Sequence, residues 1–183
     1  MLPSPLPGYP VGPIDAATGE NYGTSEAHVD RDGEPATDQP AGAGTPIPAQ
    51  SEAHCIGAGW LGSAGWTVEL EWFDGQGTLW QTRLCHLQEA APLAVGDWVK
   101  AGETVGLVGE TGAWPDGRKS ATGPHLHYVL WRNTVRVRPE DWIDFDQMDS
   151  LEEGDDEMLT YEELTALKDH LGLISACLNQ LHE

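Results

Sequence analysis

The alternation of apolar and polar positions indicates a chain built mainly from short strands. From residue 21 to residue 143, short runs of β-branched and aromatic residues alternate with Gly-rich turns. This is the pattern of a compact antiparallel β-domain. The clearest runs cover residues 66–72, 78–87, 104–109, 125–132 and 134–138. We therefore expect a mainly β fold, with one antiparallel β-sheet domain over 21–143.

The two segments next to this domain follow other patterns. Residues 1–20 contain five prolines, which deny the backbone helical hydrogen bonds and favour an extended chain. We expect a Pro-rich extended N-terminal arm there. Residues 144–158 are rich in Asp and Glu, and such a charge run is typical of a solvated acidic linker.

The last segment, residues 159–183, changes to a helical period. Its apolar residues recur at alternating intervals of three and four, at Leu164, Leu167, Leu171, Ile174, Leu178 and Leu181. This spacing lines one face of an amphipathic α-helix, and Thr160 with Glu163 forms a capping box at its start. Two interpretations stay open, namely docking on the β-domain and association with a second copy as a short coiled coil.

Charge and composition exclude several classes of partner. The formal net charge is −21, so nucleic acid and anionic lipid would repel the chain. No apolar run reaches the roughly 18 residues that a membrane span needs, and the N-terminus lacks the basic and apolar regions of a signal peptide. Cys55, Cys85 and Cys177 have no paired spacing, so neither a disulfide framework nor a Cys-based zinc site is expected.

The most specific motif is Thr-Gly-Pro-His-Leu-His at residues 122–127. In a strand, residues two apart project from the same face of the sheet. His125 and His127 can therefore reach one metal-centred site, while Leu126 and Tyr128 face the other way. The motif predicts that chemistry occurs at the start of the strand over 125–132.

Two further motifs accompany this one. His86 stands directly before a leucine and is followed, over residues 95–112, by a Gly-Asp turn, a second Gly turn and a strand that ends in Gly-Glu-Thr-Gly. Asp38 precedes a Gly-Thr-Pro turn at residues 44–46. The types and order of these residues resemble the lysostaphin-type (LytM-like) zinc peptidoglycan endopeptidases, and the resemblance spans residues 21–143.

The resemblance implies a fold, a reaction and a set of site residues. The fold would be the lysostaphin-like antiparallel β-sheet metallopeptidase domain, and the reaction would be hydrolysis of peptide bonds in bacterial peptidoglycan with one Zn²⁺. Matched residue by residue, Asp38 and His127 are metal ligands. His86 and His125 are then the catalytic histidines that deprotonate water or stabilise the tetrahedral intermediate.

The remaining metal ligand departs from the family pattern. The family has a histidine four positions before the ligand Asp, and Glu34 stands there in this chain. A carboxylate oxygen binds zinc at about 2.0–2.2 Å, so we favour Glu34 as the ligand. His28 is the alternative, either as a pair with Asp32 at the family's internal spacing or brought next to Asp38 while Glu34 stays in solvent.

Residues 113–119 form an insertion relative to the family, just before the paired histidines. Loops beside a site often shape substrate access. Trp114 from this loop is therefore a candidate residue of the substrate groove. Tyr128, which follows His127 in the next strand, is taken as a second candidate. An ordinary surface hairpin is the alternative interpretation of the loop.

The expected function is that of a metal-dependent peptidoglycan endopeptidase. Without a signal peptide, delivery to the cell wall would depend on host lysis machinery or on a phage particle, as for a bacteriophage lysin or a virion-associated wall hydrolase. The helix over 159–183 would then join copies to each other or to a phage tail protein. The alternative is a catalytically inactive lysostaphin-like module that binds a partner or serves as a structural tail component, with Glu34 marking the lost site.

Overall fold

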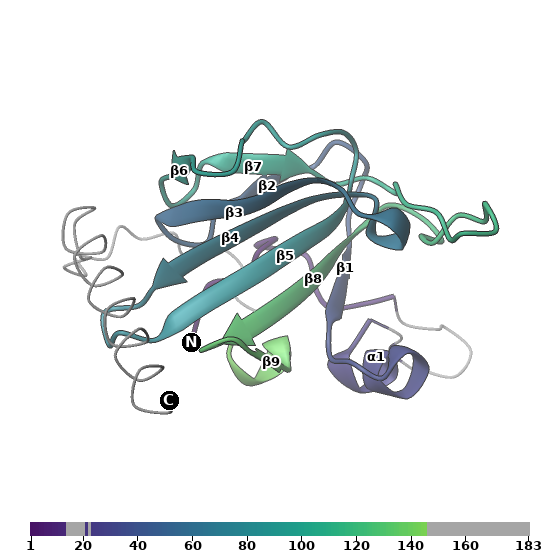
Figure 1. Cartoon of the computed structure of the whole chain (residues 1–183). Helices are drawn as coiled ribbons and strands as arrows, with labels where there is room; N and C mark the ends of the chain where they lie inside the picture. The colour runs from purple at the N-terminus through teal and green to yellow at the C-terminus, as the bar shows by residue number, and fades with distance from the viewer. Residues whose placement is uncertain (14–20, 22, 146–183) are drawn as a thin grey trace, which may run out of the picture. The chain divides into compact units, whose positions relative to one another are not determined.

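Antiparallel strand pairing organises the chain (Figure 1). The computed structural model describes residues 1–13, 21 and 23–145. Its elements are α1 (Ser25–Asp32), β1 (Thr37–Pro40), β2 (Pro46–Pro48), β3 (Ala53–Trp60), η1 (Gly62–Ala64), β4 (Trp66–Phe73), β5 (Leu79–Leu87), β6 (Trp98–Val99), β7 (Thr104–Leu107), β8 (His125–Arg132), β9 (Val135–Val137) and η2 (Pro139–Asp141). The main sheet has the order β1-β8-β5-β4-β3-β6, with β9 pairing with β8, and β2 and β7 form a second, two-stranded sheet.

The side-chain alternation along β8 separates the core from the site. Leu126, Tyr128 and Leu130 are fully buried, whereas His125 and His127 lie partly exposed on the opposite face. This alternation follows from the period of two in a strand. One face of β8 therefore packs in the core while the other carries the paired histidines.

The mainly β antiparallel fold expected from the sequence is confirmed, and the predicted strand runs correspond to β4, β5, β7, β8 and β9. The sequence pattern did not predict β1, β2, β3, β6 or α1. Both β1 and β2 contain proline, which cannot donate to a strand ladder and so argues against a strand. The predicted linker over 144–158 lies almost wholly outside the described residues, and the predicted helix over 159–183 lies wholly outside them, so both stay predictions.

The first residues of the chain pack against the core. Leu6 is 1% exposed and belongs to the core cluster. Gln39 of β1 holds the segment by side-chain hydrogen bonds, in which its Nε2 donates to Ser4 Oγ and to the Leu6 carbonyl oxygen, both at 3.1 Å. Leu2 forms an isolated parallel β-bridge with Ile143, which lies near the last described residues in the sequence. Residues 1–13 are thus part of the folded domain.

The chain divides into two compact units, of which the first contains the elements of the site. Of the second unit, the structure describes only Phe73–Thr78, at the connection between β4 and β5. Asp74 organises this turn, because its Oδ1 accepts hydrogen bonds from the backbone N–H groups of Gln76 and Thr78. No helix among the described residues is both long enough and apolar enough to cross a membrane.

The buried position of Leu6 makes the first segment testable. We expect Leu6→Ala to lower the free energy of unfolding by about 2–5 kcal/mol, because it removes buried methyl groups and leaves a cavity. The matched control is Leu61→Ala, since Leu61 is 46% exposed and a surface change costs within about 0.5 kcal/mol. Urea denaturation followed by tryptophan fluorescence measures both, and equal stabilities would contradict the packing of this segment.

Candidate metal centre

Strand pairing at the edge of the main sheet brings the Asp38 carboxylate to the histidines of β8. β1 pairs with β8 so that Asp38 lies opposite His127, and Asp38 Oδ1 is 2.8 Å from His127 Nδ1 and 3.7 Å from His125 Nε2. Burial alone would raise the pKa of Asp38, but hydrogen bonds from His127 and His28 outweigh it and hold this pKa well below its usual range. Asp38 is therefore an anion at neutral pH.

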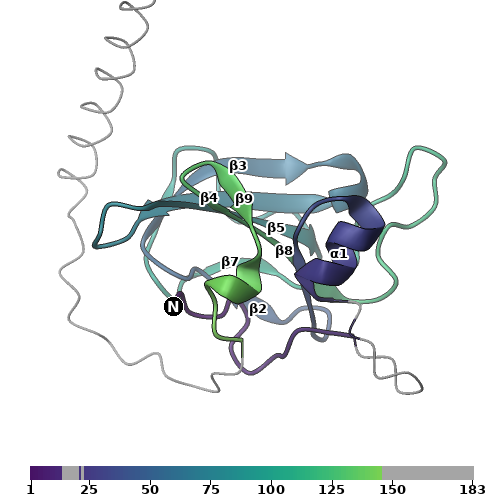
Figure 2. The same cartoon turned by 90° about the horizontal axis from the view of Figure 1, so that it is seen from below.

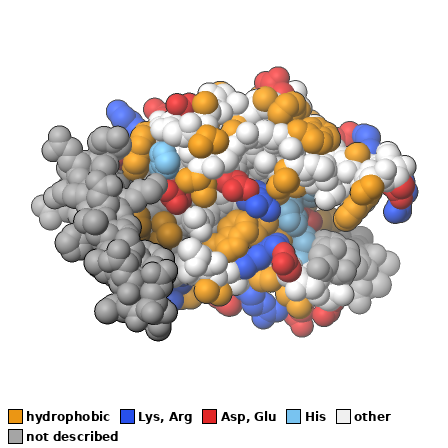
Figure 3. All heavy atoms as spheres, viewed as in Figure 1, with side chains coloured by type: hydrophobic (Ala, Val, Ile, Leu, Met, Phe, Trp, Pro, Cys, Tyr) orange, Lys and Arg blue, Asp and Glu red, His pale blue; other side chains and the backbone are white. Residues whose placement is uncertain are grey.

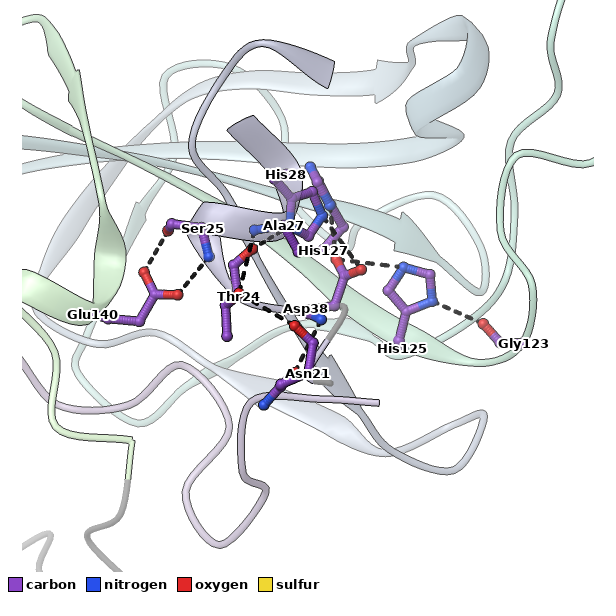
Figure 4. A network of polar contacts seen from close by, with 11 residues as sticks. Asn21, Thr24, Ser25, Ala27, His28, Asp38, Gly123, His125, His127 and Glu140 are labelled. Carbon is purple, nitrogen blue, oxygen red and sulfur yellow. Dashed lines mark hydrogen bonds and ion pairs between the residues drawn. The ribbon is translucent and has the colours of Figure 1, made fainter. Parts of the chain in front are cut away.

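A helix that the sequence pattern did not reveal supplies another imidazole (Figure 4). α1 begins after Thr24, whose side chain accepts a hydrogen bond from Ala27 N, and it ends at Gly33 in the left-handed conformation. His28 is 1% exposed. Its Nδ1 bonds to the Thr24 carbonyl oxygen at 2.9 Å, and its Nε2 lies 3.4 Å from Asp38 Oδ2. The signal for this helix was present, as a threonine N-cap and a terminal glycine.

His86 enters the same site from the end of β5. Its backbone has a φ of 59°, a left-handed conformation that is uncommon for residues other than glycine. Its Nδ1 lies 2.7 Å from the Thr111 carbonyl oxygen. Burial, together with the charge of the neighbouring His125, lowers the pKa of His86 to about 4. His86 is therefore neutral at physiological pH.

The hydrogen bonds of three rings fix the position of their protons. A carbonyl oxygen can only accept, so the Nδ1 atoms that face Thr111, Gly123 and Thr24 must carry hydrogen. In their neutral forms, His86 and His125 then present Nε2 as a lone pair, and the Nε2 of His28 faces Asp38 Oδ2. The ring centroids of His86 and His125 are 4.8 Å apart, so these acceptors are close neighbours.

The donor set fits a metal cation. Among the described residues, two groups of three side chains could each hold a metal ion, and within each group the ligand atoms lie within 4.8 Å of one another. The first group is His28, Asp38 and His127, and the second is His86, His125 and His127. Imidazole nitrogen and carboxylate oxygen are the usual ligands of zinc besides thiolate. The lone pairs of several acceptors repel one another unless a positive charge lies between them. The first group also contains an anion, Asp38, which suits a divalent ion best.

Glu34 belongs to neither group. Its carboxylate forms an ion pair with Arg136 Nη1, 102 positions away along the chain. Arg136 Nε also donates to the carbonyl oxygen of Pro35 at 2.8 Å. The Glu34 side chain is 64% exposed. The residue that lies next to Asp38 is therefore His28, the alternative of the sequence analysis, and not the favoured Glu34.

The four histidines of the two groups, together with Asp38, Glu34 and Arg136, line a cleft of about 670 Å³. Figure 3 shows histidine side chains at the surface on the right of the molecule, beside apolar, basic and acidic groups. Trp114 also lines the cleft, together with Ser63 and Ala64 of η1, and its role in a substrate groove stays a prediction. The Trp114 side chain is 46% exposed.

Tyr128 does not line this cleft, so its assignment to the groove is corrected. The side chain is fully buried, and its hydroxyl donates to Gln50 Oε1 at 2.7 Å. The reason is the alternation along β8, because a strand that points His127 into the site points Tyr128 into the core.

Known proteins are similar to the part of the chain that carries most of this site. The model of Peptidase family M23 matches residues 33–139. The glycyl-glycine endopeptidase ALE-1 of Staphylococcus capitis is 34% identical over 92 residues, which are 50% of this chain and 22% of the relative. The murein hydrolase activator EnvC of Escherichia coli (strain K12) is 31% identical over 103 residues, which are 56% and 22%. The chain thus spans less than a quarter of the length of either relative.

Solved structures give the same fold. A putative peptidase M23 from Pseudomonas aeruginosa is 29% identical with a TM-score of 0.52, over 76% of this chain and 48% of that one. The antimicrobial peptidase lysostaphin from Staphylococcus simulans is 24% identical with a TM-score of 0.50, over 84% of this chain and 54% of that one. The lysostaphin-like fold expected from the motifs is confirmed.

Close backbone packing at Gly109 holds His86 and His125 together. Gly109 O accepts a hydrogen bond from His125 N at 3.1 Å. A Cβ at this position would lie 2.4 Å from Gln88 Cα and 2.8 Å from the His86 carbonyl oxygen. Only glycine fits here without a shift of one of the two segments.

We expect Gly109→Ala to lower the free energy of unfolding by about 1–3 kcal/mol through overpacking. Gly75→Ala is the control, because nothing lies within 4 Å of a Cβ there and such a change costs within about 0.5 kcal/mol. Chemical denaturation of the two variants compares them directly. Similar midpoints and slopes would contradict the close approach.

Proposed function

We propose, from the premise that the chain belongs to peptidase family M23, that it is a metal-dependent endopeptidase that hydrolyses peptide bonds in bacterial peptidoglycan. One observation carries this conclusion. Asp38, His28 and His127 converge with His86 and His125 at a single cleft, in the manner of a metal site flanked by acid–base groups.

The metal in this proposal is one Zn²⁺, held by His28, Asp38 and His127. Support comes from the ligand atoms of these three residues, which lie within 4.8 Å of one another. A catalytic zinc site typically has three protein ligands and keeps one position open. When bound, the ion supplies a Lewis acid that polarises a carbonyl group and acidifies water.

His86 and His125 perform proton transfer in the same proposal. Each donates its Nδ1 hydrogen to a carbonyl oxygen, which orients the ring and leaves Nε2 of the neutral ring as a proton acceptor. The protonated ring is then an N–H donor, either to the developing oxyanion or to the departing amine. The lowered pKa of His86, about 4, keeps this residue in the accepting form before reaction.

The proposed substrate is a cell-wall peptide, and the site of action is the bacterial cell wall. ALE-1, a glycyl-glycine endopeptidase by name, shares 34% of aligned residues with this chain. The cleft of about 670 Å³ has the size of a site for a short peptide segment. Release as a bacteriophage lysin or attachment to a virion stays a prediction.

A second candidate function is that of a binding module without turnover. The relative EnvC, 31% identical, is named as an activator of murein hydrolases. In this candidate the cleft would bind a protein or wall component, and His86 and His125 would have no proton to transfer. Turnover of peptidoglycan separates the two functions.

The first test concerns turnover. Purified protein with Zn²⁺ should clear suspensions of peptidoglycan and release new amino termini, and a chelator should stop both. We expect His125→Ala to keep its metal and to lose about 10²–10⁴-fold in rate, the usual contribution of acid–base catalysis. His54→Ala is the control, because His54 pairs with Glu71 outside the cluster. A protein that binds Zn²⁺ but releases no amino termini would favour the binding module.

The second test concerns the ligand next to Asp38. We expect His28→Ala to weaken Zn²⁺ binding by more than the roughly 10–100-fold that follows loss of an outer partner, since a ligand itself is removed. Glu34→Ala should bind Zn²⁺ like the wild type, because the Glu34 carboxylate pairs with Arg136. Competition with a chelating dye measures both affinities. A loss in Glu34→Ala alone would return the role of ligand to Glu34.

A further inference from the structure

The helix that carries His28 is short and has no apolar anchor. α1 has eight residues, and isolated helices of this length are marginal in water. Its buried described side chains are those of Ser25 and His28, each 1% exposed, whereas Val29 is 40% exposed. The helix is therefore docked by polar contacts rather than by burial of an apolar face, and the position of His28 depends on those contacts.

Two of these contacts come from the carboxylate of Glu140 in η2. Its Oε1 accepts a hydrogen bond from Ser25 N at 2.6 Å, and its Oε2 accepts one from Ser25 Oγ. Figure 4 shows this pair on one side of the network and His28 with Asp38 on the other. The first N–H groups of a helix have no partner within the helix and attract negative charge. One carboxylate thus satisfies two donors that are buried with Ser25.

The contact also fixes which way the helix faces. Residues three apart lie on the same side of a helix, so Ser25 and His28 share the face that points into the protein. The backbone before the helix is tied to β1, because Asp38 N donates to the Gly23 carbonyl oxygen at 2.8 Å. The hydrogen bond between Asp38 and Gly23 fixes where the helix begins. The hydrogen bonds between Ser25 and Glu140 fix the rotation of the helix about its own axis.

Glu140 itself is held by the core. The preceding Pro139 is buried, and Ile143 belongs to the core cluster. The carbonyl oxygen of Trp142 accepts a hydrogen bond from Leu2 N at 2.7 Å. The carboxylate is therefore carried by a fixed segment and can position the helix.

We propose that Glu140 is a positioning residue for the metal ligand His28, acting through Ser25 at the start of α1. This inference rests on the proposed function, in which His28 binds the metal. The family match covers residues 33–139, so the helix, its ligand and Glu140 all lie outside it. α1 and Glu140 together place the His28 imidazole next to Asp38. The family pattern led us to expect Glu34 at that point.

A double-mutant cycle tests this inference, with Zn²⁺ alone as the probe and its dissociation constant as the measurement. Glu140→Ala should weaken Zn²⁺ binding between about 10-fold and 100-fold, the range for partners that orient a ligand. In a His28→Ala background, the same change should have no further effect, because its effect passes through His28. Glu140→Gln, which keeps one acceptor oxygen, should recover part of the affinity.

The control is Asp141→Asn, which removes a neighbouring negative charge from η2 and should leave Zn²⁺ binding unchanged. An equal loss from Glu140→Ala in both backgrounds, or no loss in either, would overturn the inference and leave the ligand assignment intact. If His28→Ala binds Zn²⁺ like the wild type, the ligand assignment itself fails. Thermal unfolding of each variant identifies any that do not fold, in which case Ser25→Ala, which removes only the hydroxyl donor, replaces Glu140→Ala in the cycle.

Discussion

The rest of the site depends on the contacts that the buried carboxylate of Asp38 makes with the surrounding histidines. Asp38 lies in an edge strand whose pairing places it opposite His127. A shift of this pairing by one residue would turn the side chain to the other face of the sheet. Burial of an anion is costly unless hydrogen bonds or positive charge compensate it. The hydrogen bond of His127 and the close approach of the His28 ring provide that compensation, and they bring imidazole groups to the same point.

The remaining imidazoles are oriented by the backbone rather than by other side chains. His86 and His125 are each fixed by a carbonyl oxygen, from Thr111 and Gly123. Thr111 is itself held, since its Oγ1 donates to the Leu87 carbonyl oxygen at 2.6 Å and accepts from Trp66 N at 3.0 Å. In the proposed reaction, such support would hold these rings in place before substrate arrives, so that little reorganisation would be needed.

Sequence reasoning recovered the parts of the site that depend on local periodicity or on motif order. The alternation of a strand was enough to place His125 and His127 on one face, and the motif order led to Asp38 and His86. Sequence reasoning did not predict the ion pair between Glu34 and Arg136, because the two residues lie 102 positions apart and no local pattern links them. Counting back from Asp38 assumed that the ligand stays on the same stretch of chain.

In the structure, a helix instead brings a more distant residue, His28, to the side of Asp38. The signals for α1 were present in Thr24 and Gly33, but a helix of this length is too short to stand out by periodicity. The strands β1 and β2 were missed for a different reason. Their prolines argue against pairing, yet β1 lies at an edge of its sheet and β2 pairs with a single neighbour, where a missing N–H is tolerated.

The exchange of a carboxylate for an imidazole next to Asp38 also changes the electrostatics of the site. Glu34 and Asp38 together would nearly cancel the charge of a divalent ion and weaken it as a Lewis acid. With His28 in that place, Asp38 is the single anion of its group, and about one unit of positive charge on the proposed divalent ion would remain to polarise a substrate. The ion pair with Arg136 keeps the Glu34 carboxylate compensated by a cation. In the proposed metal site, the docked helix is therefore more than a substitute for a missing residue, since it would preserve the charge balance that the proposed hydrolysis needs.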